Sequence, residues 1–158
     1  MSTSPAIHIF AIPAIIAVQG DVRLQITLEQ LLKSGFTDMG GCLIGGVKSP
    51  QFGFERFSRN RETVIQFQIE DQRDSRKILS WKCLDSIKVK LASKDVVVFG
   101  DGCCFIDGRM DPEIVCIAID GSSEYLRVRR AWRANRKTQR FEPIPTKGVK
   151  CINEGYGV

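Results

Sequence analysis

A dense cluster of cationic side chains lies near the end of the chain. Between residues 127 and 140 there are seven basic residues and no acidic one. A tryptophan stands within this stretch, and Tyr125 and Phe141 flank it. Arginine predominates, and its planar guanidinium suits bidentate contacts to phosphate or carboxylate and stacking on flat rings. The candidate residues for binding an anionic partner are Arg127, Arg129, Arg130, Trp132, Arg133, Arg136, Lys137 and Arg140.

Two kinds of partner fit this basic stretch. Cations interleaved with aromatic rings suit single-stranded nucleic acid, although the chain contains no RNP aromatic pattern, GXXG loop or zinc finger. The same cations also suit a solvated face that pairs with acidic residues of this chain or of a protein neighbour. The net charge of +5 and the isoelectric point of about 9.0 favour anionic partners in general.

Four carboxylates lie in turns between apolar runs: Asp101, Asp107, Asp111 and Glu113. Hard cations prefer several oxygen ligands, so a metal-dependent enzyme that uses these residues is one alternative function. Their spacing lacks the one-in-two ligand rhythm of a calcium-binding EF-hand loop. Aspartate is also common in turns because its side chain bonds the local backbone. We therefore expect no metal site and no cofactor.

The catalytic alternatives are few because the chain has one histidine, His8, which lies in an apolar run. A histidine-based triad would need His8 as its base, and zinc sites built on two histidines are excluded. No phosphate-binding loop pattern is present. The expectation is that the protein is not an enzyme.

Six cysteines are present, and none forms a Cys-x-x-Cys pair, so a structural zinc site has no support. Most are expected to be small buried hydrophobic residues. If a disulfide exists, we expect it to involve Cys42 or Cys151, because these two fall in irregular segments that gain most from being tied down. Such a bridge would indicate an oxidising compartment or the outside of a particle.

The N-terminal run Pro5–Val18 contains 14 mostly apolar residues. It is shorter than the roughly 20 residues that span a bilayer. No basic residue precedes it, which argues against a signal peptide. We predict two buried strands bent at Pro13; an uncleaved apolar anchor, or a surface that docks a partner, is the alternative. The expected location is the cytoplasm or an assembled particle, without a membrane.

Apolar periodicity predicts strands over much of the chain. Ile87–Leu91 alternates as a strand wetted on one face, whereas Val96–Phe99 and Ile114–Ile119 are continuous apolar runs, typical of strands covered on both faces. With Cys103–Ile106 and the turns between them, these predict a meander over residues 87–120. Thr63–Glu70 predicts another strand. For Arg76–Leu84 we favour a strand over a short helix.

Two short helices are predicted. Thr27–Lys33 begins with a capping box, in which Thr27 and Gln30 satisfy each other's backbone amides. Ala131–Gln139 would be a surface helix or an extended arm, and the two prolines after it exclude helix there. Phe36–Asn60 is the least regular part. Two pairs of glycines bracket Cys42–Ile44 there, which indicates either a flexible loop or a strand with bulged ends.

The sequence predicts a mainly β protein, an antiparallel sandwich or partly closed barrel with one or two short helices. The competing fold is an α+β layer with more helix around Asp74–Leu84. We expect one domain over residues 1–158, with a basic C-terminal arm at about 127–140 and an extended tail over 141–158.

The favoured functional hypothesis is a non-enzymatic interaction or assembly subunit, of a virus-like particle or a mobile-element complex. It would engage protein neighbours through apolar segments and the basic arm, and we expect a homo-oligomer. The alternatives are a nucleic-acid-binding module that uses residues 127–140 and a metal-dependent enzyme that uses the Asp101–Glu113 carboxylates.

Overall fold

The computed structural model of the chain describes residues 26–158 except residue 47. The predictions for His8 and for Pro5–Val18 lie outside the described residues. The described part contains one helix, α1 (Leu28–Lys33), and eleven strands. No helix in this part is long and apolar enough to cross a membrane.

The first sheet consists of four strands in chain order: β1 (Thr37–Ile44), β2 (Phe52–Arg59), β3 (Glu62–Asp74) and β4 (Lys77–Lys90). All neighbours are antiparallel. Residues 36–60, expected to be the least regular part, form β1 and β2. For the glycine-rich segment, the strand and not the flexible loop is confirmed, and its register shifts between Asp38 and Gly41. Glycine explains the difference: a Cβ at Gly41 would lie 1.9 Å from the carbonyl oxygen of Phe54, so glycine lets the bulged strand β1 approach β2.

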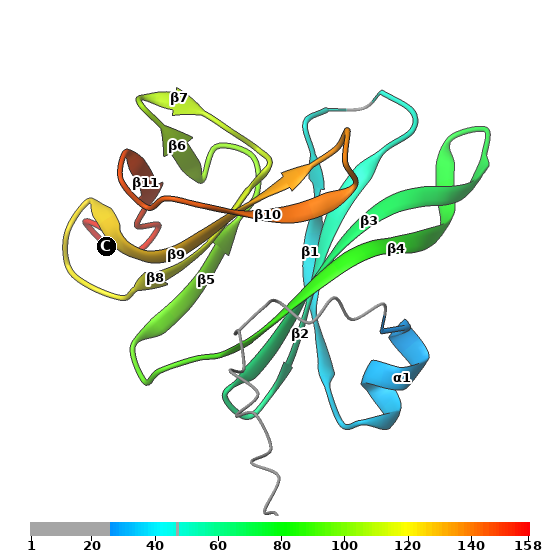
Figure 1. Cartoon of the computed structure of the whole chain (residues 1–158), viewed down its shortest axis with the longest axis horizontal. Helices are drawn as coiled ribbons and strands as arrows, with labels where there is room; N and C mark the ends of the chain where they lie inside the picture. The colour runs from blue at the N-terminus through cyan, green and yellow to red at the C-terminus, as the bar shows by residue number, and fades with distance from the viewer. Residues whose placement is uncertain (1–25, 47) are drawn as a thin grey trace, which may run out of the picture.

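The second sheet contains the other seven strands. They are β5 (Asp95–Phe99), β6 (Cys104–Ile106), β7 (Arg109–Met110), β8 (Ile114–Ile119), β9 (Tyr125–Asn135), β10 (Arg140–Ile144) and β11 (Val149–Ile152). Their order is β5-β8-β9-β11-β6-β7, and β10 also pairs with β9. Figure 1 shows this sheet to the left of the first one, with β10 crossing between them.

The predicted meander over residues 87–120 is wrong, although its strands exist. Residues 87–90 belong to β4 in the first sheet, β5 pairs with β8, and β6 pairs with β7 and β11. The five residues Ile114–Ala118 are all buried, because a separate apolar core covers each face of β8. Within its sheet, β8 lies between β5 and β9. The turn residues show where strands end, but they do not show which strands pair.

The predicted helix over Ala131–Gln139 is also wrong. This segment is the end of β9 and a turn that leads into β10. Ala131, Trp132 and Ala134 are buried on two faces of the sheet, and that burial overrides helix propensity. The Asn135 side chain accepts hydrogen bonds from the turn amides of Lys137 and Thr138. The segment expected to be an extended tail contains β10 and β11.

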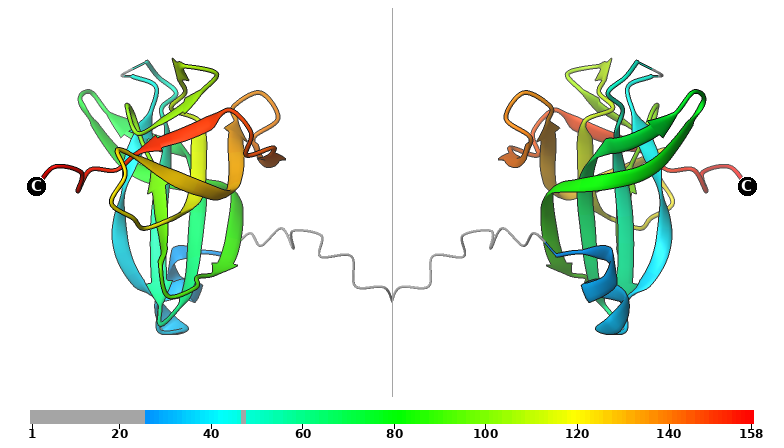
Figure 2. Two further views of the ribbon diagram at one scale, coloured as in Figure 1. Left: turned by 90° about the vertical axis from the view of Figure 1, so that its left-hand side faces the viewer. Right: turned by 90° about the vertical axis from the view of Figure 1, so that its right-hand side faces the viewer.

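The two sheets pack face to face as a sandwich, which confirms the mainly β fold with a short helix (Figure 2). The main core lies between them and includes Phe54, Phe67 and Phe141, whose rings are within 6.3 Å of one another, centroid to centroid. A second core lies on the back of β8 and contains the cysteines of β6, β8 and β11. The capping box of α1 is present as predicted.

One buried carboxylate joins the two sheets. Asp85 in β4 is almost fully buried, and its Oδ2 accepts a hydrogen bond of 2.8 Å from the backbone amide of Phe141 in β10. Its Oδ1 accepts a second from the amide of Ser86. Asp85 therefore holds β10 against the first sheet.

Replacing Asp85 with Ala should lower the free energy of unfolding by about 2–4 kcal/mol, because the buried Phe141 amide loses a charged acceptor. Urea denaturation followed by circular dichroism measures the change. The exposed Asp74→Ala is the matched control and should cost less than about 0.5 kcal/mol. Equal losses in the two variants would contradict the role given to Asp85.

Candidate functional site

The basic stretch lies on the β9–β10 hairpin. Four of its eight candidate side chains are buried or form ion pairs within the fold. Trp132 is 2% exposed, so its ring is not available to stack on a base. Arg129 forms an ion pair with Asp95. Arg133 contacts Asp111 at 2.9 Å and Glu113 at 3.6 Å, and Arg136 contacts Glu113 at 2.6 Å.

Four cations of the stretch have no ion pair with the described residues: Arg127, Arg130, Lys137 and Arg140. The Arg130 guanidinium lies 4.6 Å from the centroid of the Trp132 ring, so part of its charge is taken up by that aromatic face. At the start of β9, Tyr125 is exposed with the Lys150 ammonium 5.4 Å from its ring. A smaller basic-aromatic surface therefore remains around Tyr125 and Arg127.

The four candidate metal-binding carboxylates do not converge. Asp111 and Glu113 pair with arginines, while Asp107 lies beside Gly148, where a Cβ would be 2.4 Å from its Oδ1. Asp101 is exposed in the turn after β5. Among the described residues, one group of three or more potential ligands gathers closely: Cys104, Cys116 and Cys151. Two of these form a disulfide. None of the four carboxylates belongs to a close group of described residues, so the geometry does not support a cation site at the carboxylates.

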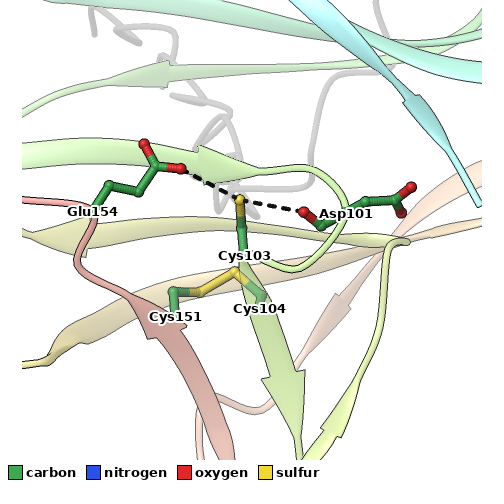
Figure 3. The surroundings of a disulfide bond; sticks show 5 residues. All are labelled: Asp101, Cys103, Cys104, Cys151 and Glu154. Atoms are coloured by element: carbon green, nitrogen blue, oxygen red, sulfur yellow. Dashed lines mark hydrogen bonds between the residues drawn. A yellow bond between two sulfur atoms is a disulfide. The ribbon is translucent and has the colours of Figure 1, made fainter.

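The disulfide joins Cys104 in β6 to Cys151 in β11, with their Cα atoms 4.2 Å apart (Figure 3). Of the two cysteines singled out from the sequence, Cys151 is thus bridged and Cys42 is a free thiol. The partner is Cys104 because β6 and β11 are sheet neighbours in that register, a non-local pairing that the sequence does not display. Burial raises the pKa of the nearby Cys116 thiol to about 12, which keeps it protonated and unreactive.

A hollow with a volume of about 670 Å³ lies on the outer face of the first sheet. Helix α1 closes one end, and β2, β3 and β4 form the floor and wall. Its apolar lining includes Leu79, which is 58% exposed, and Trp81, which is 37% exposed. We call this hollow the sheet groove; its lining is Ile26, Thr27, Leu28, Asp38, Glu55, Phe57, Gln66, Gln68, Leu79, Ser80, Trp81, Lys82 and Cys83.

A smaller hollow of about 230 Å³ extends the sheet groove toward β1. The two share Glu55, Gln68 and Trp81. The Trp81 ring lies over Gly53, where an added Cβ would be 3.5 Å from two ring atoms. An elongated ligand could therefore cross the sheet past Trp81.

The polar groups of the sheet groove are ordered by the fold. Gln66 is nearly fully buried and donates from Nε2 to the carbonyl oxygen of Ile26 at 2.6 Å, while its Oε1 accepts from Gln68 at 2.9 Å. Burial raises the pKa of Glu55 to about 7, and a hydrogen bond to Asp38 together with the Asp38 charge adds to the effect. Near neutral pH a large share of the Glu55 side chains is therefore protonated, and Glu55 can act as a hydrogen-bond donor.

Sequence reasoning missed the sheet groove and its acidic pair. Leu79 and Trp81 were assigned to a strand correctly, but strand alternation does not say whether the covered face is inner or outer. Asp38 and Glu55 lie in the region that was expected to be irregular. The strand spacing of Phe52 and Phe54 was the available signal for a strand there.

We found no match to this chain among models of protein families, curated protein sequences or solved structures. The functional interpretation consequently depends on the geometry of the described residues.

The Glu55→Gln variant should be more stable than the wild type at pH 8 but not at pH 4. The folded protein holds the Glu55 proton more tightly than the unfolded chain, so the wild type loses stability as pH rises from the ordinary value of 4.5 through about 7. Glutamine cannot ionise and avoids this loss. Thermal unfolding between pH 4 and pH 8 measures the difference in melting temperature.

The control is Glu124→Gln, which changes an exposed carboxylate near the second sheet. Its melting temperature should follow that of the wild type at every pH. A pH-independent offset for Glu55→Gln would contradict the raised pKa.

Proposed function

We propose that this protein is a non-enzymatic assembly subunit whose copies join through the sheet groove. The observation that carries the proposal is the exposure of Leu28, Leu79 and Trp81 around one groove. Large exposed apolar patches on soluble proteins mark contact sites, and a groove with these three apolar side chains on its lining favours a docking role. Homo-oligomers are the commonest soluble assemblies.

The occupant that we propose is the apolar run Pro5–Val18 of a neighbouring copy. The run carries no charged residue and is followed, after seven residues, by Ile26, which lines the groove. Fourteen extended residues reach about 45 Å, whereas four strands spaced about 4.8 Å apart span about 15 Å. The run is therefore long enough to cross the four-stranded sheet of a neighbouring copy.

The assembly hypothesis predicts the mass of the full-length protein in solution. Size-exclusion chromatography with light scattering should give a multiple of 17.7 kDa for the wild type. Leu79→Glu and Trp81→Glu should each shift the mass to that of a monomer, because a carboxylate would be buried in the apolar contact. Ile12→Asp, in the run itself, should do the same.

Met110→Glu is the matched control, since Met110 is an exposed apolar residue on β7, away from the groove. Its oligomeric mass should equal that of the wild type, and circular dichroism should show that all four variants are folded. A wild type that is monomeric at every concentration would contradict the proposal, even if Trp81 were shielded by the protein's own run.

Nucleic-acid binding is the second candidate, because Arg127, Lys137 and Arg140 have no ion pair with the described residues. Tyr125 is exposed near Arg127 at the start of β9, and Lys137 and Arg140 lie at the other end of that strand. Arginine contacts to phosphate make affinity fall steeply with salt. In this hypothesis Tyr125, and not Trp132, supplies the stacking surface.

Replacing both Arg127 and Lys137 with Ala should weaken binding to a fluorescent single-stranded oligonucleotide. It should also reduce the slope of log affinity against log salt by about 1.4, that is about 0.7 for each lost phosphate contact. Fluorescence anisotropy over a salt series gives both quantities. Lys33→Ala, on α1, is the control, and absence of binding by the wild type at low salt would remove this candidate.

A further inference from the structure

Two free thiols, Cys42 and Cys103, both lie close to Gly100, a glycine in the turn after β5. Cys42 is on β1 of the first sheet, and Cys103 is in the turn after β5, directly before β6. A Cβ added at Gly100 would lie 3.4 Å from the Cys42 sulfur and 3.8 Å from the Cys103 sulfur. Because these two distances share one end, the sulfurs are at most about 7 Å apart.

The local backbone can supply the approach that a bridge needs. A disulfide requires sulfurs about 2 Å apart and Cα atoms within about 7 Å. Rotation about the two Cα–Cβ bonds moves each sulfur by more than 1 Å, and the turn contains Gly100 and Gly102, both at positive φ. Neither cysteine is fully buried, so a small oxidant can reach the pair.

We propose that Cys42 and Cys103 form a dithiol that closes to a second disulfide and ties the four-stranded sheet to the turn before β6. The oxidant would be a small-molecule disulfide such as oxidised glutathione. One cysteine thiolate attacks this disulfide and releases one glutathione thiolate, leaving a mixed disulfide. The other cysteine thiolate attacks the mixed disulfide, releases the second glutathione and completes the bridge. Two electrons pass from the cysteine pair to the oxidant, and both cysteine protons leave with the products.

The surroundings of the pair control the rate. Burial, followed by the charge of Asp101, raises the pKa of Cys42 to about 11. Burial and the Glu154 carboxylate raise the pKa of Cys103, whose sulfur donates weak hydrogen bonds to the Asp101 carbonyl and Glu154 (Figure 3). Both groups are thus thiols near neutral pH, and the bridge should form slowly at pH 7 and faster as pH rises.

The existing disulfide makes the product easy to recognise. Cys103 and Cys104 are adjacent and stay on one tryptic peptide, residues 95–109, which the Cys104–Cys151 bridge joins to residues 151–158. A Cys42–Cys103 bridge adds residues 34–48 to this pair. The oxidised protein should therefore yield one three-peptide species under non-reducing conditions.

The test uses the full-length protein treated with oxidised glutathione at pH 8.5, then alkylated, digested with trypsin and examined by mass spectrometry without reduction. The three-peptide species should appear, with Cys83 and Cys116 alkylated. In Cys103→Ser, residues 34–48 should leave the species, and Cys42 should retain one glutathione. Cys83→Ser is the matched control and should give the same species as the wild type.

The charge effect gives a second readout. Asp101→Asn should close the bridge several-fold faster than the wild type at pH 8.5, since it removes a carboxylate that disfavours the Cys42 thiolate. Wild-type protein in which Cys42 and Cys103 remain alkylated, or in which each carries its own glutathione, would overturn the proposal. So would a bridge from Cys42 that persists in Cys103→Ser.

Discussion

The contact between the two sheets depends on one buried acceptor, the Asp85 carboxylate. It receives the Phe141 amide from β10 and the adjacent Ser86 amide, so the place where the sheets meet is fixed by a polar group inside an apolar core. The stacked rings of Phe54 and Phe141 lie beside it and supply non-directional burial. Burial alone would permit β10 to slide along the first sheet, whereas a charged hydrogen bond specifies one register. The β9–β10 hairpin, with its arginines, is thereby given a fixed position.

Sequence patterns predicted the elements of the fold better than their pairing. Alternation located the strand at Thr63–Glu70, and capping chemistry located α1, because both signals are local. The pairings of β5 with β8, and of β11 with β6 and β9, join strands that are remote in the chain, so the meander was wrong and the partner of Cys151 was not identified. The same limit applies to the sites. The basic residues were recognised as a group, but their pairing with Asp95, Asp111 and Glu113 depends on the fold. The sheet groove likewise depends on the fold, because its position is set by the part of the first sheet that α1 leaves uncovered.

The molecule separates its interaction chemistry between its two sheets. The first sheet presents an apolar groove with a carboxyl pair, and the second presents cations that are partly neutralised by its own acids. Cys104, Cys116 and Cys151 lie in the second core, and Cys103 lies in the turn near Cys42 of β1. Docking through the first sheet would therefore leave the basic hairpin free for another partner.

The position of β11 has a consequence for the order in which the protein acquires its structure during synthesis. The first sheet is built from three successive hairpins, so every strand finds its neighbour as soon as it leaves the ribosome. In the second sheet, β11 lies between β6 and β9, and it is the last strand of the chain. The edges of β6 and β9 that β11 covers stay open until β11 has been synthesised, and open edges invite pairing with other chains. A nascent chain thus has a complete first sheet, and an open second sheet that is exposed to misassembly, until β11 emerges.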